Sequence, residues 1–322
     1  MEKQQEYWGS QPAWYFFLAA MGAMMFVIAA VADLLGNPIA GQINGWVSIV
    51  ALAAAGIGAL LLLEELTHKS KGHLVNARPF ASVMSFGSLV QSLYMPLVFV
   101  YGTFFFDFIP WAGLGWLKMI VAVLAIIAAL LYVTYPGVEL GEARGRGFWN
   151  GGGLIGVFLI NGAVTGAAAL TLILCVLGYS ESAYTITIKN IAAALLVAQL
   201  FAIPGYVLGM KLSPAEEARR GANKLWSGEF SSSFWAGTVI FGTLVPMIIT
   251  LLFTSIYWLV IAAVLVLVGG VCFRIDFLRA AVRVTLPGEE KAEMSRKEIA
   301  SLAAVLENRW QEKARVLNPQ NK

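Results

Sequence analysis

The sequence predicts an all-α integral membrane protein with eight transmembrane helices. The chain is 59% hydrophobic and only 13% charged, and its mean hydropathy is +0.74. Apolar runs long enough for a helix to cross a bilayer recur along the chain. These observations exclude a soluble globular protein, and no nucleic-acid-binding surface is expected.

The predicted spans follow these apolar runs in order, and polar segments separate them. They cover residues 13–35, 43–63, 81–104, 114–135, 150–178, 185–211, 232–253 and 255–273. An even number of spans places both chain ends on one side of the membrane. We call this the terminal side and the opposite one the far side.

The basic residues are distributed unequally between the two sides. Of the 22 Lys and Arg residues, all except Lys118 and Lys189 fall on the terminal side. The positive-inside rule therefore predicts a multi-pass protein of the cytoplasmic membrane with both termini in the cytoplasm. A face that docks soluble partners explains the same asymmetry, because most acidic residues lie there too. The first apolar run follows an acidic segment and is long enough to remain as a span, so no cleaved signal peptide is expected.

The potential metal ligands are few and scattered. Cys175 and Cys272 stand alone in apolar segments, and His68 and His73 lie in the polar connection after the second span. An iron–sulfur cluster needs grouped cysteines, and a haem needs imidazoles within the helix bundle. We expect no iron–sulfur cluster, haem or other metal in this chain. A membrane subunit without a metal can still react with a quinone, whose carbonyls need hydrogen-bond donors and a proton route.

The first candidate segment for such a site opens the first span. Gln11 and Tyr15 share a helix face at i, i+4 spacing, and Trp14 lies between them. For Trp14, a position in the aromatic belt at the membrane surface is the alternative.

The second candidate segment connects the second and third spans. Its polar residues are Glu64, Glu65, Asn76 and Arg78, followed within the third span by a helical stripe of Ser85, Ser88 and Ser92. Small hydroxyl residues on a stripe either hold helices together or contact a ligand. Glu64 and Glu65 are alternatively solvated loop charges.

The third candidate segment follows the fourth span. Pro136 and Gly137 come directly after Tyr135, and they predict that the span ends there with the phenol at its rim. Charged and amphipathic residues continue to the next span: Glu139, Glu142, Arg144, Arg146, Trp149 and Asn150. An ordinary connection does not need this combination, so we interpret it as functional.

Four ordered segments together carry a family resemblance. They are WYFFLAA at 14–20, NARP at 76–79 with MSFG at 84–87, YPG at 135–137 with FWN at 148–150, and SGEF at 227–230 with FWAG at 234–237. In these segments the chain resembles the NrfD/PsrC family, the quinone-handling membrane subunits of polysulfide-reductase-like complexes. The resemblance covers nearly the whole chain. It implies two four-helix bundles, with a site for menaquinone or another quinone in the first. It also implies that a ferredoxin-like iron–sulfur subunit docks on one face and serves a molybdopterin catalytic subunit.

The resemblance also assigns site residues. The family's quinone-contacting tyrosine corresponds to Tyr135, and its polar pair corresponds to Gln11 and Tyr15, where Tyr15 replaces the frequent histidine. A phenol does not relay protons near neutrality as imidazole does, so protons are expected at carboxylates. From the three candidate segments themselves we add Trp14, Arg78 and Ser85 for the quinone, Glu65, Glu139 and Glu142 for proton transfer, and Arg144, Trp149, Asn150 and Asn76 for partner docking or site support.

The predicted organisation has four parts. They are a first bundle with the quinone site (1–135), a functional connection (136–149), a second bundle (150–273) and a polar tail (274–322). In the tail, Ser295 and Glu298 form a capping box, and Ile299, Leu302, Leu306 and Trp310 share one face of a cytoplasmic amphipathic helix. Ser213, Pro214 and Glu216 similarly predict a short surface helix.

The second bundle is predicted to be mainly a scaffold. Gly152/Gly156 and Gly162/Gly166 are expected to allow close packing, and Asn161 and Thr165 to bond across helices. Asp33 is a candidate counter-charge for Lys189, and snorkelling of the Lys189 side chain to the membrane surface is the alternative. A secondary transporter is the alternative function. It predicts broken helices in both halves, whereas Pro204-Gly205 and Pro246 interrupt only the second.

Overall fold

The computed structural model describes residues 2–3, 10–65, 80–143, 145–284 and 298–310. The chain divides into two compact units, Gln4–Val282 and a smaller one formed by Met1–Lys3 with Arg283–Lys322. The first unit holds the membrane-spanning helices.

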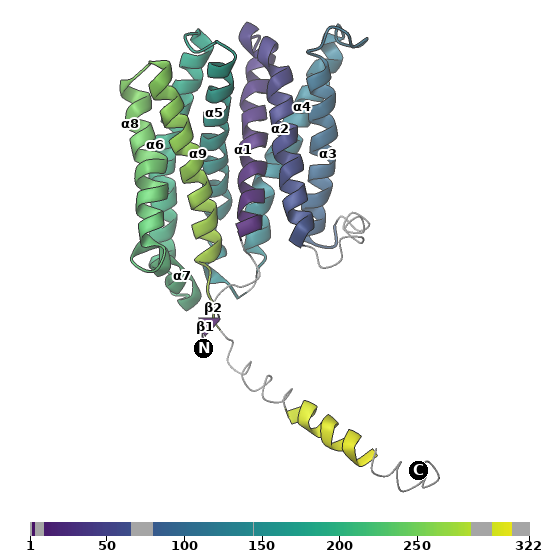
Figure 1. Cartoon of the computed structure of the whole chain (residues 1–322), viewed down its shortest axis with the longest axis vertical. Coiled ribbons are helices and arrows are strands. Elements are labelled where there is room, and N and C mark those ends of the chain that lie inside the picture. Colours follow the sequence, from purple (N-terminus) through teal and green to yellow (C-terminus); the bar gives the residue numbers. More distant parts are fainter. Residues whose placement is uncertain (1, 4–9, 66–79, 144, 285–297, 311–322) are drawn as a thin grey trace, which may run out of the picture. The chain divides into compact units, whose positions relative to one another are not determined.

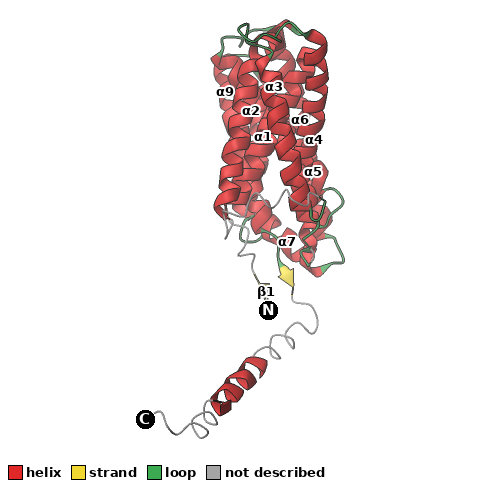
Figure 2. Cartoon of the chain, turned by 90° about the vertical axis from the view of Figure 1, so that its right-hand side faces the viewer, coloured by secondary structure: helices red, strands yellow, loops and turns green. Residues whose placement is uncertain are grey.

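Eight helices are long and apolar enough to cross a membrane, which confirms the predicted fold class. They are α1 (Ser10–Leu34), α2 (Pro38–Glu65), α3 (Val83–Thr103), α4 (Gly115–Gly141), α5 (Leu154–Val176), α6 (Ala183–Lys211), the π-helix η3 (Ser233–Leu244) continuing as α8 (Val245–Leu252), and α9 (Ile256–Arg279). They lie side by side along one common direction (Figures 1 and 2).

The spans form two groups that meet at α1 and α5. Helices α1 to α4 pack together, as do α5, α6, η3/α8 and α9, and α1 also contacts α5 and α9 (Figure 1). In α1 and α5, 78% of the most apolar window is buried, whereas no other candidate span exceeds 39%. The grouping agrees with two four-helix bundles, which we call the first half and the second half.

Glycines on α5 allow this close contact. A Cβ atom at Gly166 would lie 2.6 Å from the backbone nitrogen of Met25, and one at Gly162 would lie 3.2 Å from Cβ of Ala20. Both contacts are on α1, so the predicted notch at Gly162/Gly166 is confirmed. The notch predicted at Gly152/Gly156 is wrong, because a Cβ atom at either position would meet nothing within 4 Å.

The predicted end of the fourth span at Tyr135 is also wrong. Helix α4 continues through Pro136 and Gly137 to Gly141. A proline removes one backbone donor, a loss that membrane helices tolerate where neighbouring groups compensate. Gly137 is needed for packing instead, since a Cβ atom there would lie 3.0 Å from Cα of Ile155 on α5. Tyr135 is therefore inside a continuous helix.

Short elements complete the first unit. The 3-10 helix η2 (Gly147–Trp149) precedes α5, and the surface helix α7 (Glu216–Trp226) precedes η3. The predicted surface helix is confirmed, but Ser213 is not its cap. Its Oγ accepts the backbone N–H of Ala215, 3.3 Å away, and the helix begins at Glu216.

The smaller unit contains a strand pair that the sequence did not predict. Strand β1 (Glu2–Lys3) pairs antiparallel with β2 (Arg283–Val284). Residues 298–310 are helical, which agrees with the predicted tail helix, and the apolar residues of its predicted face are exposed: Ile299, Leu302, Leu306 and Trp310. The predicted cap Ser295 lies outside the described residues, and the cytoplasmic position of this helix stays a prediction.

Candidate functional site

Tyr15 and Tyr135 are buried near the terminal side of the first half. Tyr15 is 2% exposed and Tyr135 is 3% exposed. Each ring lies against a glycine of a neighbouring helix. A Cβ atom at Gly58 of α2 would lie 3.0 Å from Cδ2 of Tyr15, and one at Gly87 of α3 would lie 2.1 Å from Cε2 of Tyr135. All four helices of the first half therefore help to position the two phenols.

Glu139 adds a carboxylate to these phenols. It follows Tyr135 by one helical turn on α4 and is half-buried, and its side chain interacts with that of Tyr135. Glu142 lies further out, after the last residue of α4, and is exposed. Of these two predicted proton-transfer residues, only Glu139 lies beside a phenol.

In the first turns of α1, the predicted quinone residues Gln11 and Trp14 differ in burial. Gln11 is half-buried in the first turn, one turn before Tyr15. Trp14 is 41% exposed and packs edge-on against Phe17, with ring centroids 6.0 Å apart. This exposure favours the aromatic-belt interpretation for Trp14.

The serine stripe of α3 bonds within its own helix. Ser82 caps α3, its Oγ accepts the backbone N–H of Ser85, and the two hydroxyls lie 2.9 Å apart. Ser92 Oγ donates to the Ser88 carbonyl, 2.8 Å away. A polar contact between α3 and α2 comes instead from Gln91, whose Nε2 donates to the Ala55 carbonyl at 3.3 Å. Gln91 belongs to the dense set of polar residues in the third span that predicts a wet or paired helix face, and this bond to α2 agrees with a paired face.

Trp149 is buried in the second half and bonds to helix α9. It is 0% exposed, and its Nε1 donates to the Phe277 carbonyl of α9 at 3.1 Å. The Arg146 guanidinium lies over its ring, 5.0 Å from the centroid. The Trp149 side chain is buried, whereas Asn150 beside it is exposed. Their assignment to partner docking or site support stays a prediction.

Several predicted residues fall where the structure gives no side chain. Asn76, Arg78 and Arg144 lie outside the described residues, and so does the side chain of Glu65. Their roles stay predictions. Cys175 and Cys272 are unpaired, and His68 and His73 lie outside the described residues.

A column of aromatic rings, which sequence reasoning missed, continues from Tyr15 towards the far side. Tyr132 lies edge-on to Tyr15 at a centroid distance of 6.4 Å and stacks on Tyr94 at 5.1 Å. Phe26 then lies edge-on to Tyr94 at 6.3 Å and to Tyr101 at 5.3 Å. The seven-residue spacing of Tyr94 and Tyr101 places both rings on one helix face. This spacing is the sequence pattern that predicts part of the column.

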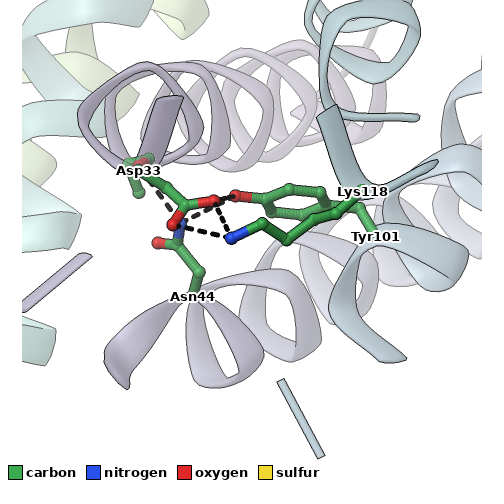
Figure 3. A network of polar contacts seen from close by, with 5 residues as sticks. Asp33, Asn44, Tyr101 and Lys118 are labelled. Carbon is green, nitrogen blue, oxygen red and sulfur yellow. Dashed lines mark hydrogen bonds and ion pairs between the residues drawn. The ribbon is translucent and has the colours of Figure 1, made fainter. Parts of the chain in front are cut away.

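The column ends at a polar cluster on the far side (Figure 3). Lys118 Nζ lies 3.0 Å from Asp33 Oδ2, and the Tyr101 hydroxyl donates to the same oxygen at 2.9 Å. Asn44 Nδ2 donates to the Tyr101 hydroxyl at 2.9 Å. The predicted pairing of Asp33 with Lys189 is wrong, because Lys189 lies on α6, where it lines a small pocket of the second half.

The second half contains a different polar network. Asn161 Nδ2 donates to Gln199 Oε1 at 3.2 Å, and Gln199 Nε2 donates to Thr243 Oγ1 at 2.8 Å. This confirms that Asn161 bonds across helices. The same prediction is wrong for Thr165, whose hydroxyl bonds to the carbonyls of Asn161 and Gly162 in its own helix.

Comparison with known proteins agrees with this arrangement. The family model described as "Polysulphide reductase, NrfD" matches residues 1–286. The chain is also similar to Protein NrfD homolog of Haemophilus influenzae, with 26% identity over 305 residues, which covers 85% of this chain and 94% of that protein. The resemblance inferred from the four sequence segments is thus confirmed, and the chain belongs to the polysulphide reductase NrfD family.

Proposed function

We propose that this chain is the quinone-reacting membrane subunit of a respiratory oxidoreductase complex. Its family comprises membrane subunits of quinone-linked oxidoreductase complexes. The chain exchanges electrons between the quinone pool and a docked iron–sulfur subunit, which serves a molybdopterin-type catalytic subunit. The observation that carries this proposal is the seating of Tyr135 on the bare backbone of Gly87, with Glu139 and Tyr15 beside it.

These side chains match the needs of quinone chemistry. A quinol that becomes a quinone releases two protons and two electrons. The phenols of Tyr135 and Tyr15 supply hydrogen bonds to the quinone oxygens, and the Glu139 carboxylate accepts a proton from the quinol. The electrons pass to the iron–sulfur subunit. Quinone reduction is the same reaction in reverse.

The terminal side is the proposed docking face. The phenols and Glu139 lie near this side, so electrons cross little of the membrane before they reach a partner there. The exposed residues next to the site include Glu142 and Asn150, and α7 adds further charges. By the positive-inside rule this face is cytoplasmic, and we place the partner inside the cell.

The transporter alternative receives less support from the helices. Discontinuous helices near the bilayer centre are typical of secondary transporters. Here α3, α4 and α6 run without a break through Pro96, Pro136 and Pro204. Pro96 also corrects the expectation that only the second half contains a mid-span proline.

Isolation of the native complex in mild detergent tests the proposal. Mass spectrometry identifies the subunits, and metal and quinone are quantified. We expect an iron–sulfur protein, a catalytic subunit with molybdenum or tungsten, and quinone to co-purify with the chain. A chain that purifies alone and without quinone would overturn the proposed function.

The Tyr135→Phe variant then tests the site. It removes one hydroxyl and keeps the ring, and quinol-linked turnover of the assembled complex should fall about 100-fold. The control is Tyr257→Phe, because Tyr257 is 78% exposed on α9. Full turnover of assembled Tyr135→Phe complex would exclude the site.

A further inference from the structure

We propose that the second half binds one anionic phospholipid from the far side of the membrane. Its phosphate lies at Lys189, and part of one acyl chain enters the small pocket that Lys189 lines. This inference does not rest on the proposed quinone reaction, and it assigns the chain a ligand of a different class. The bound lipid holds four helices of the second half together near their far-side ends.

The pocket lies among α5, α6, α8 and α9, and it is small and partly open. Its wall is mostly apolar and includes four alanines, whose short side chains leave the space unfilled: Ala168, Ala192, Ala262 and Ala263. In a membrane bundle, such unfilled space forfeits van der Waals contacts. A hydrocarbon chain restores these contacts, and the size of the pocket admits part of one chain while the head group stays outside.

The hydrogen-bond donor that the pocket offers to a ligand is the Lys189 ammonium. Thr171 Oγ1 donates to the Ala167 carbonyl at 2.9 Å, and Thr250 Oγ1 donates to the Met247 carbonyl at 2.9 Å. Both hydroxyl hydrogens are therefore used within their own helices. The ammonium has three hydrogens and no acceptor, so it selects a ligand that accepts hydrogen bonds.

Lys189 also lacks a counter-charge. The far side has two basic residues, Lys118 and Lys189. Lys118 pairs with Asp33 at 3.0 Å, whereas Lys189 has no ion pair or hydrogen bond with any residue that the structure describes. A charged group next to apolar surface in a membrane normally has a partner. A negatively charged ligand supplies the partner that the described residues do not provide.

The depth of Lys189 in the membrane matches that of lipid phosphates. Helix α6 has 29 residues, which gives a length of about 43 Å, whereas the hydrocarbon core is about 30 Å thick. A centred α6 therefore extends about 7 Å beyond the core at each end. Lys189 follows the far-side end at Ala183 by about 9 Å, so its backbone lies just inside the core. Its long stem lets the ammonium reach the phosphate level.

Aromatic residues mark the same level on α9. Tyr257 and Trp258 in its first turn are exposed, and the Trp258 ring stacks on Phe253 at a centroid distance of 4.8 Å. Exposed Tyr and Trp side chains are typical of the head-group level. Leu259, the next residue, lines the pocket, so the pocket reaches from the bundle interior to this level.

One cation beside an apolar pocket distinguishes among ligands. A free anion such as phosphate leaves the apolar wall unused. A zwitterionic phospholipid carries its own ammonium, which competes with Lys189 for the phosphate. An anionic phospholipid satisfies both parts of the site, because its phosphate attracts the ammonium and its acyl chain lies directly below in the hydrocarbon.

The test uses the full chain, purified in mild detergent and washed free of lipid. Phosphatidylglycerol is added in steps, native mass spectrometry counts the bound lipid, and thermal unfolding is followed in parallel. Lys189→Met keeps the apolar stem but removes the ammonium, and it should lower the affinity for the first bound lipid about fivefold. Lys189→Arg should restore the affinity. Lys211→Met is the matched control, because it removes the same charge at the other end of α6 and should bind the lipid like the unmodified chain.

Three results with these samples would overturn the inference. If phosphatidylcholine with the same acyl chains binds and stabilises equally well, Lys189 only snorkels to the surface and selects no lipid. If inorganic phosphate alone stabilises the chain as much, the site takes a free anion. If Lys189→Met binds phosphatidylglycerol as tightly as the unmodified chain, Lys189 does not hold the head group.

The Ala192→Leu variant tests the pocket separately from the charge. Ala192 lines the pocket on the same helix as Lys189, and a leucine there fills the space that we assign to the acyl chain. The affinity for phosphatidylglycerol should fall although the ammonium is retained. An unchanged affinity would overturn the position of the chain in the pocket.

Discussion

The two halves of the spanning unit share one helical plan but contain different chemistry. The first half surrounds buried tyrosines with Glu139 at one end and the Asp33–Lys118 pair at the other. The second half closes its central polar groups on one another, through Asn161, Gln199 and Thr243. Phenols and a carboxylate grouped near one side suit a bound ligand, whereas polar side chains that bond across helices hold the helices together.

The boundary between the halves explains how one supports the other. Helices α1 and α5 meet through glycines, and α1 carries Tyr15. The second half thereby fixes the helix that provides one phenol of the site. The comparison predicts that changes in the first half alter turnover, and that changes in the second half alter stability.

The largest effect is expected from Gly87→Ala. The new Cβ would lie 2.1 Å from Cε2 of Tyr135, so the ring must move away from its position. Quinol-linked turnover of the assembled complex should fall at least about 100-fold. The matched control is Gly56→Ala, a span glycine whose Cβ would meet nothing within 4 Å. Equal turnover in both variants would show that the position of Tyr135 is unimportant.

The next effect is expected at the boundary, from Gly166→Ala. Its Cβ would lie 2.6 Å from the Met25 backbone, and such overpacking costs about 2 to 3 kcal/mol of stability. Thermal unfolding in detergent measures the loss, and Gly156→Ala, with open space around its Cβ, should match the unmodified protein. A stable Gly166→Ala variant would contradict tight contact between the halves.

Trp149→Phe should weaken the second half by a smaller amount. It removes the bond from Nε1 to the Phe277 carbonyl and leaves a buried acceptor unpaired, at a cost of about 1 to 2 kcal/mol. Turnover per assembled complex should stay unchanged. Trp116→Phe is the control, because Trp116 is 62% exposed. Reduced turnover without reduced stability would assign Trp149 to the reaction.

The smallest effect is expected from Gln199→Leu. It removes two hydrogen bonds, each worth about 0.6 kcal/mol in membrane proteins. Quinol-linked turnover per assembled complex should equal that of the unmodified complex. The control on the same helix is Thr187→Val, which changes an exposed side chain. Lower turnover of the assembled Gln199→Leu complex would assign Gln199 to the reaction.

Sequence reasoning succeeded where local patterns decide. It predicted the spans, which depend on the hydropathy of neighbouring residues, and the surface helix α7, although Ser213 is not its cap. Residues 298–310 are helical as well. It failed at Pro136, where proline chemistry predicted an end and the membrane environment sustained the helix. It did not reveal that Trp149 is buried against α9, because an interfacial position and a buried one look alike in sequence.

The amino-acid sequence by itself determined that this chain crosses the membrane eight times and that Tyr15 and Tyr135 lie near one side. A span needs only about 20 apolar residues, and these are read locally. Only the tertiary structure decided that Gly87 seats Tyr135 and that Lys118, rather than Lys189, pairs with Asp33. These contacts depend on how each helix is rotated about its axis, which is set by packing against neighbours distant in the sequence.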